Sequence, residues 1–217
     1  MTVGRDVMVK IPKVRHPPKR RMSYEEFLQW ADEDVWAEWV DGEVIILTPA
    51  SLKHQRIVSF LHALIKHYAD ATDAGEVLTA PFQMYLPHVR RGREPDIIFV
   101  AKENLHRLTE NFLHGPADLV VEVISPSSAE RDRVAKFREY EAGGVREYWL
   151  IDPEGKLAEF YVAGEGGRYE RCDVEGDIYC SAVLEGFWLR LEWLWSEPLP
   201  RLDDVLRELR AGNPQSA

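Results

Sequence analysis

The stretch DLVVEVISPSS, residues 118–128, constrains the fold of this chain more than any other feature. Side chains of a β-strand point alternately to its two faces, and here both sets of positions are apolar except for Glu122. A strand that is apolar on both faces is typical of a sheet that is covered on both sides. The sequence therefore predicts a central strand with a packed layer above it and another below it.

The rest of the chain alternates between helix and strand signals, which predicts a mixed α/β (α+β) fold: a central mixed sheet flanked by helices. Ser23 and Glu26 form a capping-box pattern that starts a short helix, and Asp41-Gly42 predicts a tight hairpin turn. Helices are also expected at 51–71, 129–144 and 202–210, strands at 36–40, 43–48, 76–86, 96–100, 119–125 and 145–153, and edge hairpins between 157 and 195.

Charge is distributed unevenly along the 217 residues, whose net charge is −10. Residues 1–21 contain seven Lys or Arg against one Asp, so the remainder holds 20 basic and 36 acidic residues. This acidic remainder argues against broad electrostatic binding of nucleic acid. We expect a flexible basic tail at 1–21, a single domain at 22–210 and a frayed end at 211–217. Because no long apolar run or signal-peptide core is present, a cytoplasmic protein without membrane contact is expected.

A carboxylate on a strand like that of Glu122 needs a partner, because burying it unpaired costs several kcal/mol or raises its pKa. The partner is a Lys or Arg in an internal salt bridge, a network of hydrogen-bond donors, or a metal ion. Asp96 favours the metal, because it opens the strand DIIFV on the same face as Ile98 and Val100. Two converging carboxylates suit Mg²⁺ or Mn²⁺. The alternative for Asp96 is that it caps its own backbone.

The helix at 129–144 supplies a counter-charge. If Val134, Phe137 and Tyr140 form its buried stripe, Lys136 lies at the edge and reaches the strand ends. The alternative is a surface ion pair between Lys136 and Asp132.

Two further residues belong to this set of candidates. Glu38 is a third acid in apolar surroundings, on a hairpin strand that could have one solvated face. His54 lies on the inward side of the long helix, either as an ordinary core residue or near the acids. Tyr140 is most simply a core residue.

These residues resemble the Uma-type family of proposed endonucleases, formerly a domain of unknown function. The resemblance rests on WAEWVDGEVIILTPAS with His54, EPDIIFV, LVVEVISPSS and the run from Arg131-Asp132 through Lys136 and Tyr140 to GGVREYWLIDP. It covers about residues 23–195. The family is similar to restriction endonucleases of the PD-(D/E)XK superfamily, so the resemblance implies a restriction-endonuclease-like fold.

The resemblance also implies roles for the candidate residues. Asp96 and Glu122 match the two acids of the motif, and together with the Val123 carbonyl they would hold Mg²⁺, with Mn²⁺ as a substitute. Ile124 stands where the motif has its lysine, and Lys136 would take that place from the following helix. Glu38 matches an early acid of the family, and His54 and Tyr140 would support the site.

The expected function is hydrolysis of phosphodiester bonds in DNA through a metal-activated water. One alternative is a catalytically silent module of this fold that binds nucleic acid or a partner protein, and another is an ion network that only adds stability. Arg90, Arg91 and Arg93 are candidate phosphate contacts, or simply a solvated loop. A homodimer is expected if the aromatic segment FWLRLEWLW, residues 187–195, is partly exposed, although the same aromatics could close the core.

Overall fold

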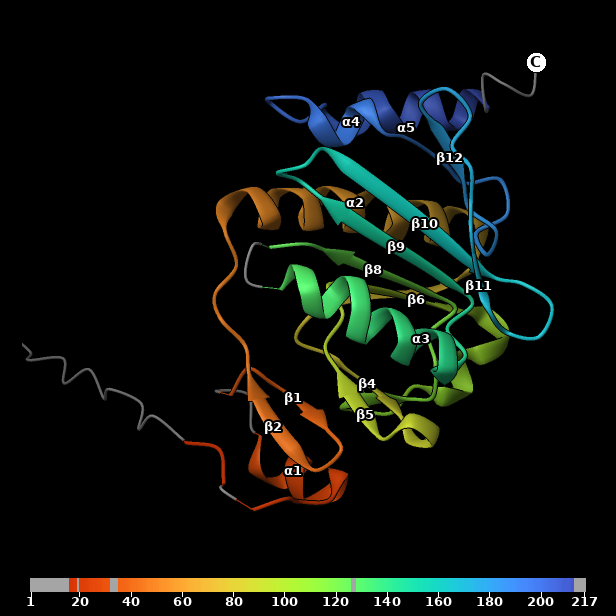
Figure 1. The fold of residues 1–217 in the computed structure, drawn as a ribbon. Helices are drawn as coiled ribbons and strands as arrows, with labels where there is room; N and C mark the ends of the chain where they lie inside the picture. Colours follow the sequence, from red (N-terminus) through yellow and green to blue (C-terminus); the bar gives the residue numbers. More distant parts are fainter. Residues whose placement is uncertain (1–15, 19, 32–34, 126–127, 213–217) are drawn as a thin grey trace, which may run out of the picture.

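The computed structural model describes residues 16–18, 20–31, 35–125 and 128–212. Six of the described strands form a mixed sheet in the order β11-β10-β9-β8-β6-β3, which is the predicted central sheet (Figure 1). β8 lies inside this sheet, parallel to β9 and antiparallel to β6. The six strands are β3 (Gly75–Thr79), β6 (Ile97–Ala101), β8 (Leu119–Val123), β9 (Glu147–Asp152), β10 (Leu157–Ala163) and β11 (Tyr169–Arg171).

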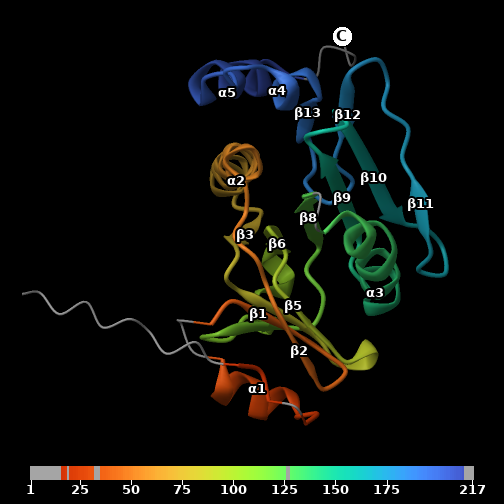
Figure 2. The ribbon, with the colours of Figure 1, turned by 60° about the vertical axis from the view of Figure 1, so that its left-hand side comes forward.

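Helices cover both faces of this sheet, as the apolar pattern of β8 predicts. Figure 2 shows α2 (Leu52–Thr72) on one side of the strands and α3 (Phe137–Gly143) on the other. Val121 belongs to the hydrophobic core that includes α2, whereas Val120 belongs to the core that includes Tyr140 of α3. The alternation of side chains along β8 is therefore confirmed, and Glu122 faces the α3 side with Val120.

A five-stranded sheet, with order β2-β1-β5-β4-β7 among the described residues, packs below the first with helix α1. The predicted hairpin is present, and Asp41 and Gly42 at its turn have φ angles of 47° and 91°. The predicted capping box of Ser23 and Glu26 begins α1. The elements of this region are α1 (Tyr24–Trp30), β1 (Ala37–Val40), β2 (Glu43–Ile46), β4 (Gln83–Leu86), η1 (Pro87–Val89), β5 (Arg91–Arg93), η2 (Lys102–Arg107) and β7 (Phe112–His114).

The strand predicted at 76–86 is wrong as a single element. Residues 75–79 pair with β6 in the six-stranded sheet, whereas residues 83–86 pair with β5 and β7 in the other sheet. Pro81 stands between the two segments and has no N–H to offer a strand ladder, which favours the break there. The chain thus crosses from one sheet to the other at this point.

The aromatic segment 187–195 does not have the exposure that would favour a homodimer. Phe187, Trp188 and Trp193 are buried and share one hydrophobic core with α2 and α5, so they close the core instead. This part contains β12 (Ile178–Cys180), β13 (Trp188–Arg190), α4 (Glu192–Trp195) and α5 (Leu202–Ala211).

The tails predicted at 1–21 and 211–217 lie mostly outside the described residues, which do not include 1–15, 19 and 213–217. Where the structure describes helices, none has both the length and the apolar character that crossing a membrane requires.

Candidate active site

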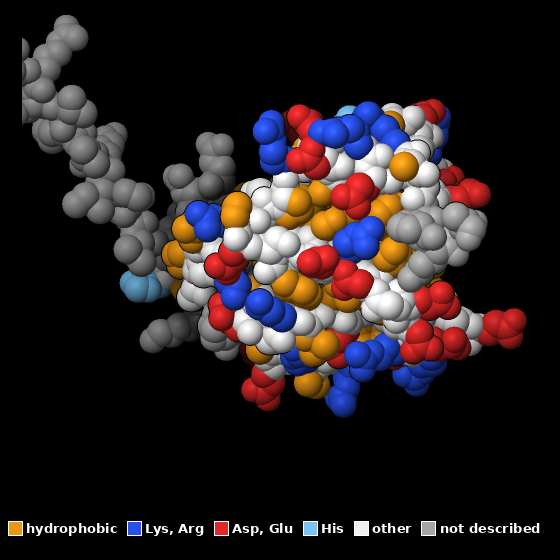
Figure 3. All heavy atoms as spheres, turned by 90° about the horizontal axis from the view of Figure 1, so that it is seen from above, with side chains coloured by type: hydrophobic (Ala, Val, Ile, Leu, Met, Phe, Trp, Pro, Cys, Tyr) orange, Lys and Arg blue, Asp and Glu red, His pale blue; other side chains and the backbone are white. Residues whose placement is uncertain are grey.

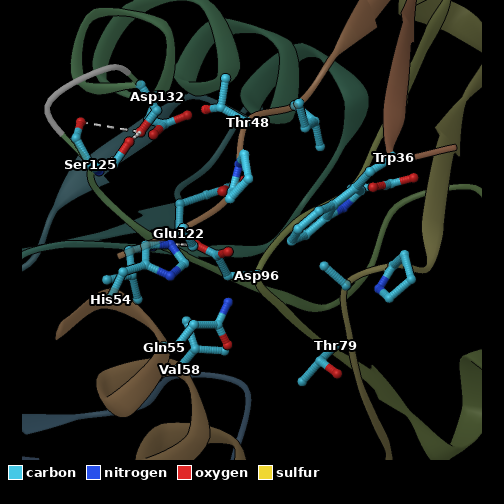
Figure 4. Close-up of a pocket in the computed structure, with 18 of the residues that line it drawn as sticks. Trp36, Thr48, His54, Gln55, Val58, Thr79, Asp96, Glu122, Ser125 and Asp132 are labelled. Atoms are coloured by element: carbon cyan, nitrogen blue, oxygen red, sulfur yellow. Dashed lines mark hydrogen bonds and ion pairs between the residues drawn. The ribbon is translucent and has the colours of Figure 1, made fainter. Parts of the chain in front are cut away.

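A cavity of about 610 Å³ lies between the two sheets at the end of β8. Its walls come from the β1–β2 hairpin, the first turns of α2, the crossing between β3 and β4, and the π-helical segment η3 (Arg131–Lys136) that precedes α3. Figure 4 shows His54, Asp96 and Glu122 close together at its centre. The charged and histidine side chains that line it, within the described residues, are Glu38, Glu94, Asp96, Glu122, Asp132, Arg131, Lys136, His54 and His62.

Asp96 reaches this cavity from the start of β6. Because β6 and β8 are antiparallel, the beginning of one strand lies beside the end of the other. The Val123 N–H donates a hydrogen bond to Asp96 Oδ2 over 2.7 Å. The alternative that Asp96 caps its own backbone is therefore wrong, because its carboxylate joins two neighbouring strands.

Glu122 is 3 % exposed, and its Oε1 accepts hydrogen bonds from Lys136 Nζ at 2.7 Å and Tyr140 Oη at 2.6 Å. Burial raises the pKa of this carboxyl group well above its ordinary value, and the Asp132 and Asp96 carboxylates raise it further. The attraction of Lys136 lowers the pKa but does not offset burial. The Glu122 carboxyl group is thus buried beside two other acids as well as the lysine.

Lys136 is buried and lies among three carboxylates. Its Nζ is 2.7 Å from Glu122 Oε1, 3.4 Å from Glu38 Oε1 and 3.5 Å from Asp132 Oδ1. Burial alone would lower the pKa of the ammonium group, but the carboxylates outweigh it and raise the pKa, which keeps Lys136 charged. The pair with Asp132 exists, but as a buried contact and not as the surface pair of the alternative.

The predicted buried stripe of this helix is wrong at Val134, which is 47 % exposed, whereas Asp132 and Lys136 are buried. The prediction assumed an α-helical rotation of about 100° per residue. Residues 131–136 form a π-helical turn, which contains an extra residue and shifts the inward face. This turn brings Lys136 from the edge of the helix into the cavity wall.

Glu38 is also buried, on β1 and so in the five-stranded sheet. Burial raises the pKa of its carboxyl group, but Lys136, Arg93 and Arg131 outweigh burial and lower the pKa to about 2. Arg93 Nη1 donates to Glu38 Oε2 at 2.7 Å. The possible solvated face of this strand therefore does not include Glu38, which remains an anion inside the protein.

The three arginines that were predicted to contact phosphate do not line the cavity. Arg93 is 2 % exposed and pairs with both Glu38 and Glu139, so a phosphate contact for it is wrong. Arg91 Nε pairs with Glu139 at 2.6 Å and Arg90 Nε with Asp41 at 2.6 Å. Neither Arg90 nor Arg91 lines the cavity, because the β5 ladder directs them toward α3 and the hairpin turn.

His54 and Tyr140 each contact one of the two central acids. Ser51 caps α2 by accepting from the His54 N–H, which fixes the first turn beside the cavity. His54 Nε2 lies 3.2 Å from Asp96 Oδ2. Burial opposes protonation of His54, but Asp96 and the Val123 backbone outweigh burial and raise its pKa. Both residues are buried like core residues, yet their polar atoms belong to the site.

Among the lining residues that the sequence predictions did not assign to the site are Trp36, Glu94, Arg131 and Asp132. Glu94 directly precedes Pro95-Asp96, and burial raises its pKa to about 7 despite a hydrogen bond from Gln83. Arg131 Nε and Asp132 Oδ1 are buried and have no hydrogen-bond partner among the described residues. Adjacency to Asp96 and the i,i+4 relation to Lys136 were the only signals for Glu94 and Asp132.

The donor set suits a hard divalent cation held partly by water. Within the described residues, no three His, Cys, Asp or Glu side chains converge as a complete metal-binding group. Asp96 and Glu122 nevertheless face one cavity, and the Asp132 Oδ1 atom there lacks a hydrogen bond. Mg²⁺ is commonly bound by one or two carboxylates with water completing its coordination. Two carboxylates surrounded by excess negative charge fit that mode of binding.

Comparisons with known proteins agree with this architecture. Residues 24–192 match the model of the Uma2 family, described as "Putative restriction endonuclease". The uncharacterized protein slr1290 of Synechocystis sp. (strain ATCC 27184 / PCC 6803 / Kazusa) is 28 % identical over 154 residues, which cover 70 % of this chain and 80 % of that protein. A crystal structure from Anabaena variabilis ATCC 29413, described as "a putative nuclease belonging to DUF820", superposes with a TM-score of 0.67 at 18 % identity. This match covers 80 % of this chain and 97 % of the other, and it confirms the predicted fold.

Proposed function

Because the chain belongs to the Uma2 family, described as "Putative restriction endonuclease", we propose that it is a Mg²⁺-dependent nuclease that hydrolyses phosphodiester bonds in DNA. The observation that carries the proposal is the convergence of Asp96 and Glu122, from neighbouring strands, on one cavity beside the charged Lys136. An acid pair and a buried lysine are the groups that metal-assisted hydrolysis needs close together.

Asp96, Glu122 and the carbonyl of Val123 would hold the cation, with Mn²⁺ able to replace Mg²⁺. A cation at such a site lowers the pKa of a bound water and offsets negative charge on the reacting phosphoryl group. Lys136 would orient that water or stabilise the charge that develops. Glu38 keeps Lys136 in position through their 3.4 Å ion pair, so it serves the reaction without touching the substrate.

Arg131 is the better candidate for a phosphate contact than the three arginines of β5 and its turn. Its side chain lines the cavity and is 32 % exposed. Its Nε lies 3.9 Å from Asp132 Oδ1, beyond hydrogen-bond distance, so the ion pair with Asp132 is a loose one. A guanidinium group donates in a fixed fork that matches phosphate oxygens.

One observation favours a catalytically silent, nucleic-acid-binding module as the second candidate. Lys136 already contacts three carboxylates, and Ile124 occupies the position where the superfamily motif has its lysine. In that case the ion network stabilises the fold and no phosphodiester is cleaved.

Plasmid nicking in the presence of Mg²⁺ or Mn²⁺ tests the proposal. We expect Glu122→Gln and Asp96→Asn to lose at least about 100-fold in rate, because a bound cation contributes several kcal/mol at the transition state. Glu103→Gln, an exposed acid outside the cavity, is the matched control and should nick like wild type. Calorimetry should show Mn²⁺ binding to wild type and not to Asp96→Asn.

Two outcomes would contradict the proposal. Nicking that persists in Glu122→Gln places the activity at another site or in a contaminant. A wild-type protein that neither nicks nor binds Mn²⁺, but still binds DNA, supports the silent module.

A further inference from the structure

Trp36 is an exposed aromatic residue in the wall of the cavity. Its relative exposure is 37 %, and it directly precedes β1. Among the large hydrophobic residues that are exposed in the described part of the chain, it is the aromatic one and the one that lines the cavity; the others are Ile46, Leu52, Val134 and Leu157. In Figure 4 its ring extends into the cavity from the side opposite His54.

The backbone of Trp36 is fixed beside a group of buried polar residues. The Leu47 N–H donates to the Trp36 carbonyl at 3.0 Å. The indole lies near the buried Glu94 carboxyl group. Gln83 in turn donates to Glu94 Oε1 at 2.7 Å and to the Ala37 carbonyl at 2.8 Å. An aromatic ring that lines a cavity on a backbone fixed in this way presents an exposed face to which a flat ligand group can stack.

The cavity is larger than a phosphate and a cation require. Its volume of about 610 Å³ lies within the usual range for small-molecule sites, about 300–1,000 Å³. Pro49 and Pro81 also line it and add flat apolar surface. A group that enters beside Asp96 and Glu122 would therefore find an apolar, aromatic compartment next to the polar one.

The charges around the cavity do not favour binding to the phosphate backbone of double-stranded DNA. Binding to double-stranded DNA rests largely on neutralising phosphates with Lys and Arg. Here five carboxylates line the cavity, and Lys136 is occupied by three of them. The face formed by α4, α5 and their neighbours does not line the cavity; there too, basic and acidic side chains of the described residues are interspersed, with no broad basic area (Figure 3). Affinity for a nucleic acid therefore has to come from a contact other than phosphate neutralisation.

We propose that Trp36 is a stacking platform for one unpaired nucleobase, so that the substrates are single-stranded, overhanging or flapped nucleic acids. Bases inside a duplex stack on each other and cannot reach the indole, whereas an unpaired base presents a free face. Stacking on aromatic side chains is the usual source of affinity for single strands and tolerates any base. This inference rests on the proposed nuclease function, because it places the base beside the phosphate that Asp96 and Glu122 would address.

The test compares wild type with Trp36→Leu, Trp36→Phe and Ile46→Ala. Ile46→Ala is the matched control, because Ile46 is exposed on the same hairpin but lies outside the cavity. The probes are a labelled single-stranded DNA, an RNA of the same sequence, a blunt duplex and a duplex with a single-stranded overhang. Anisotropy in EDTA gives Kd, and cleavage with Mn²⁺ gives KM and kcat.

We expect Trp36→Leu to raise Kd and KM for single strands and overhangs about tenfold, the loss of one base–aromatic stack, with kcat changed less than about threefold. Trp36→Phe should remain within about threefold of wild type, and Ile46→Ala should match it. Single-stranded DNA should quench wild-type tryptophan fluorescence more than that of Trp36→Phe. The DNA and RNA probes show whether the sugar matters.

Different outcomes separate this inference from the nuclease proposal. If Trp36→Leu binds and cleaves single strands like wild type, or if wild type prefers the blunt duplex, the stacking platform is wrong while the nuclease stands. If wild type cleaves no probe, the nuclease is wrong. In that event, single-strand binding that depends on Trp36 still supports the platform in a protein that does not cleave.

Discussion

Two buried glutamates lie on neighbouring parallel strands, and their surroundings differ in kind. Glu122 on β8 shares its cavity with other acids and one lysine, and burial raises its pKa. Glu147 on β9 is fully buried, and its carboxylate accepts from neutral donors on all sides. These donors are Trp149 Nε1 at 2.5 Å, Tyr179 Oη at 2.8 Å, and Ser181 Oγ, Ala182 N and Val183 N at 2.9 Å each.

The difference separates a carboxyl group that completes a structure from a carboxyl group that lines a cavity. Glu147 ties residues 179–183 to the sheet, and its hydrogen bonds satisfy both carboxylate oxygens. Among the described residues, Glu122 shares its cavity with four other acids, against the two cations Lys136 and Arg131. A buried carboxylate alone therefore does not indicate a site, whereas one whose neighbours leave negative charge unbalanced does.

Removing the lysine should have the largest effect on stability. We expect Lys136→Met to lower the free energy of unfolding by about 3–5 kcal/mol, because it leaves buried carboxylates without their shared cation. Lys53→Met is the control, since the Lys53 pair with Glu154 is exposed and worth less than about 1 kcal/mol. Urea unfolding measures both variants. Equal losses would mean that the network around Glu122 is no more important than a surface pair.

The second-largest effect on stability should come from acid, which protonates Glu38 and so weakens its ion pairs in the network around Glu122. The folded-state pKa of Glu38 is lowered to about 2 from an ordinary 4.5, so its ionisation stabilises the fold above about pH 4.5. That contribution, on the order of 3 kcal/mol, should be lost as the pH falls from 5 toward 2. Urea unfolding of wild type and Glu38→Gln should show a gap at pH 6 that narrows by pH 3. A gap that stays constant would contradict this assignment.

Substitution of Glu147 should have the smallest of the three effects and should sharpen the contrast in function. Glu147→Gln places an amide NH₂ group among hydrogen-bond donors, which should lower the free energy of unfolding by about 1–3 kcal/mol. We expect its plasmid nicking to remain at the wild-type level, since Glu147 does not line the cavity. Glu122→Gln should show the reverse, with a smaller loss of stability and no nicking. If both variants lose stability and nicking activity to the same extent, the proposed distinction between the two glutamates is wrong.

The sequence was most informative where local pattern decides the outcome. The apolar positions around Glu122 predicted a strand covered on both faces, and the need to neutralise a buried acid led to Asp96 and Lys136. The hairpin turn at Asp41-Gly42 also followed, because few residues adopt positive φ angles easily. In each case the information lies within a few residues of the feature itself.

Predictions that depend on distant partners failed. Arg93 stands in a basic stretch and looks solvated, but Glu38 and Glu139 from other elements surround it. Val134 was placed inward because nothing in the periodicity reveals a π-helical turn. Trp36 received no role, because only the tertiary arrangement brings its partly exposed ring to the cavity.

The ion pair of Lys136 with Glu38 and Glu122 has a consequence for when the site comes into being during synthesis. Glu38 emerges early from the ribosome on the first hairpin, Glu122 follows, and the lysine that neutralises both emerges last. Until η3 has docked, Glu122 lacks its lysine, so a partly made chain has no assembled centre. The hydrolytic capacity we propose would thus arise only with completion of the fold, which would protect the cell's nucleic acids from unfinished copies.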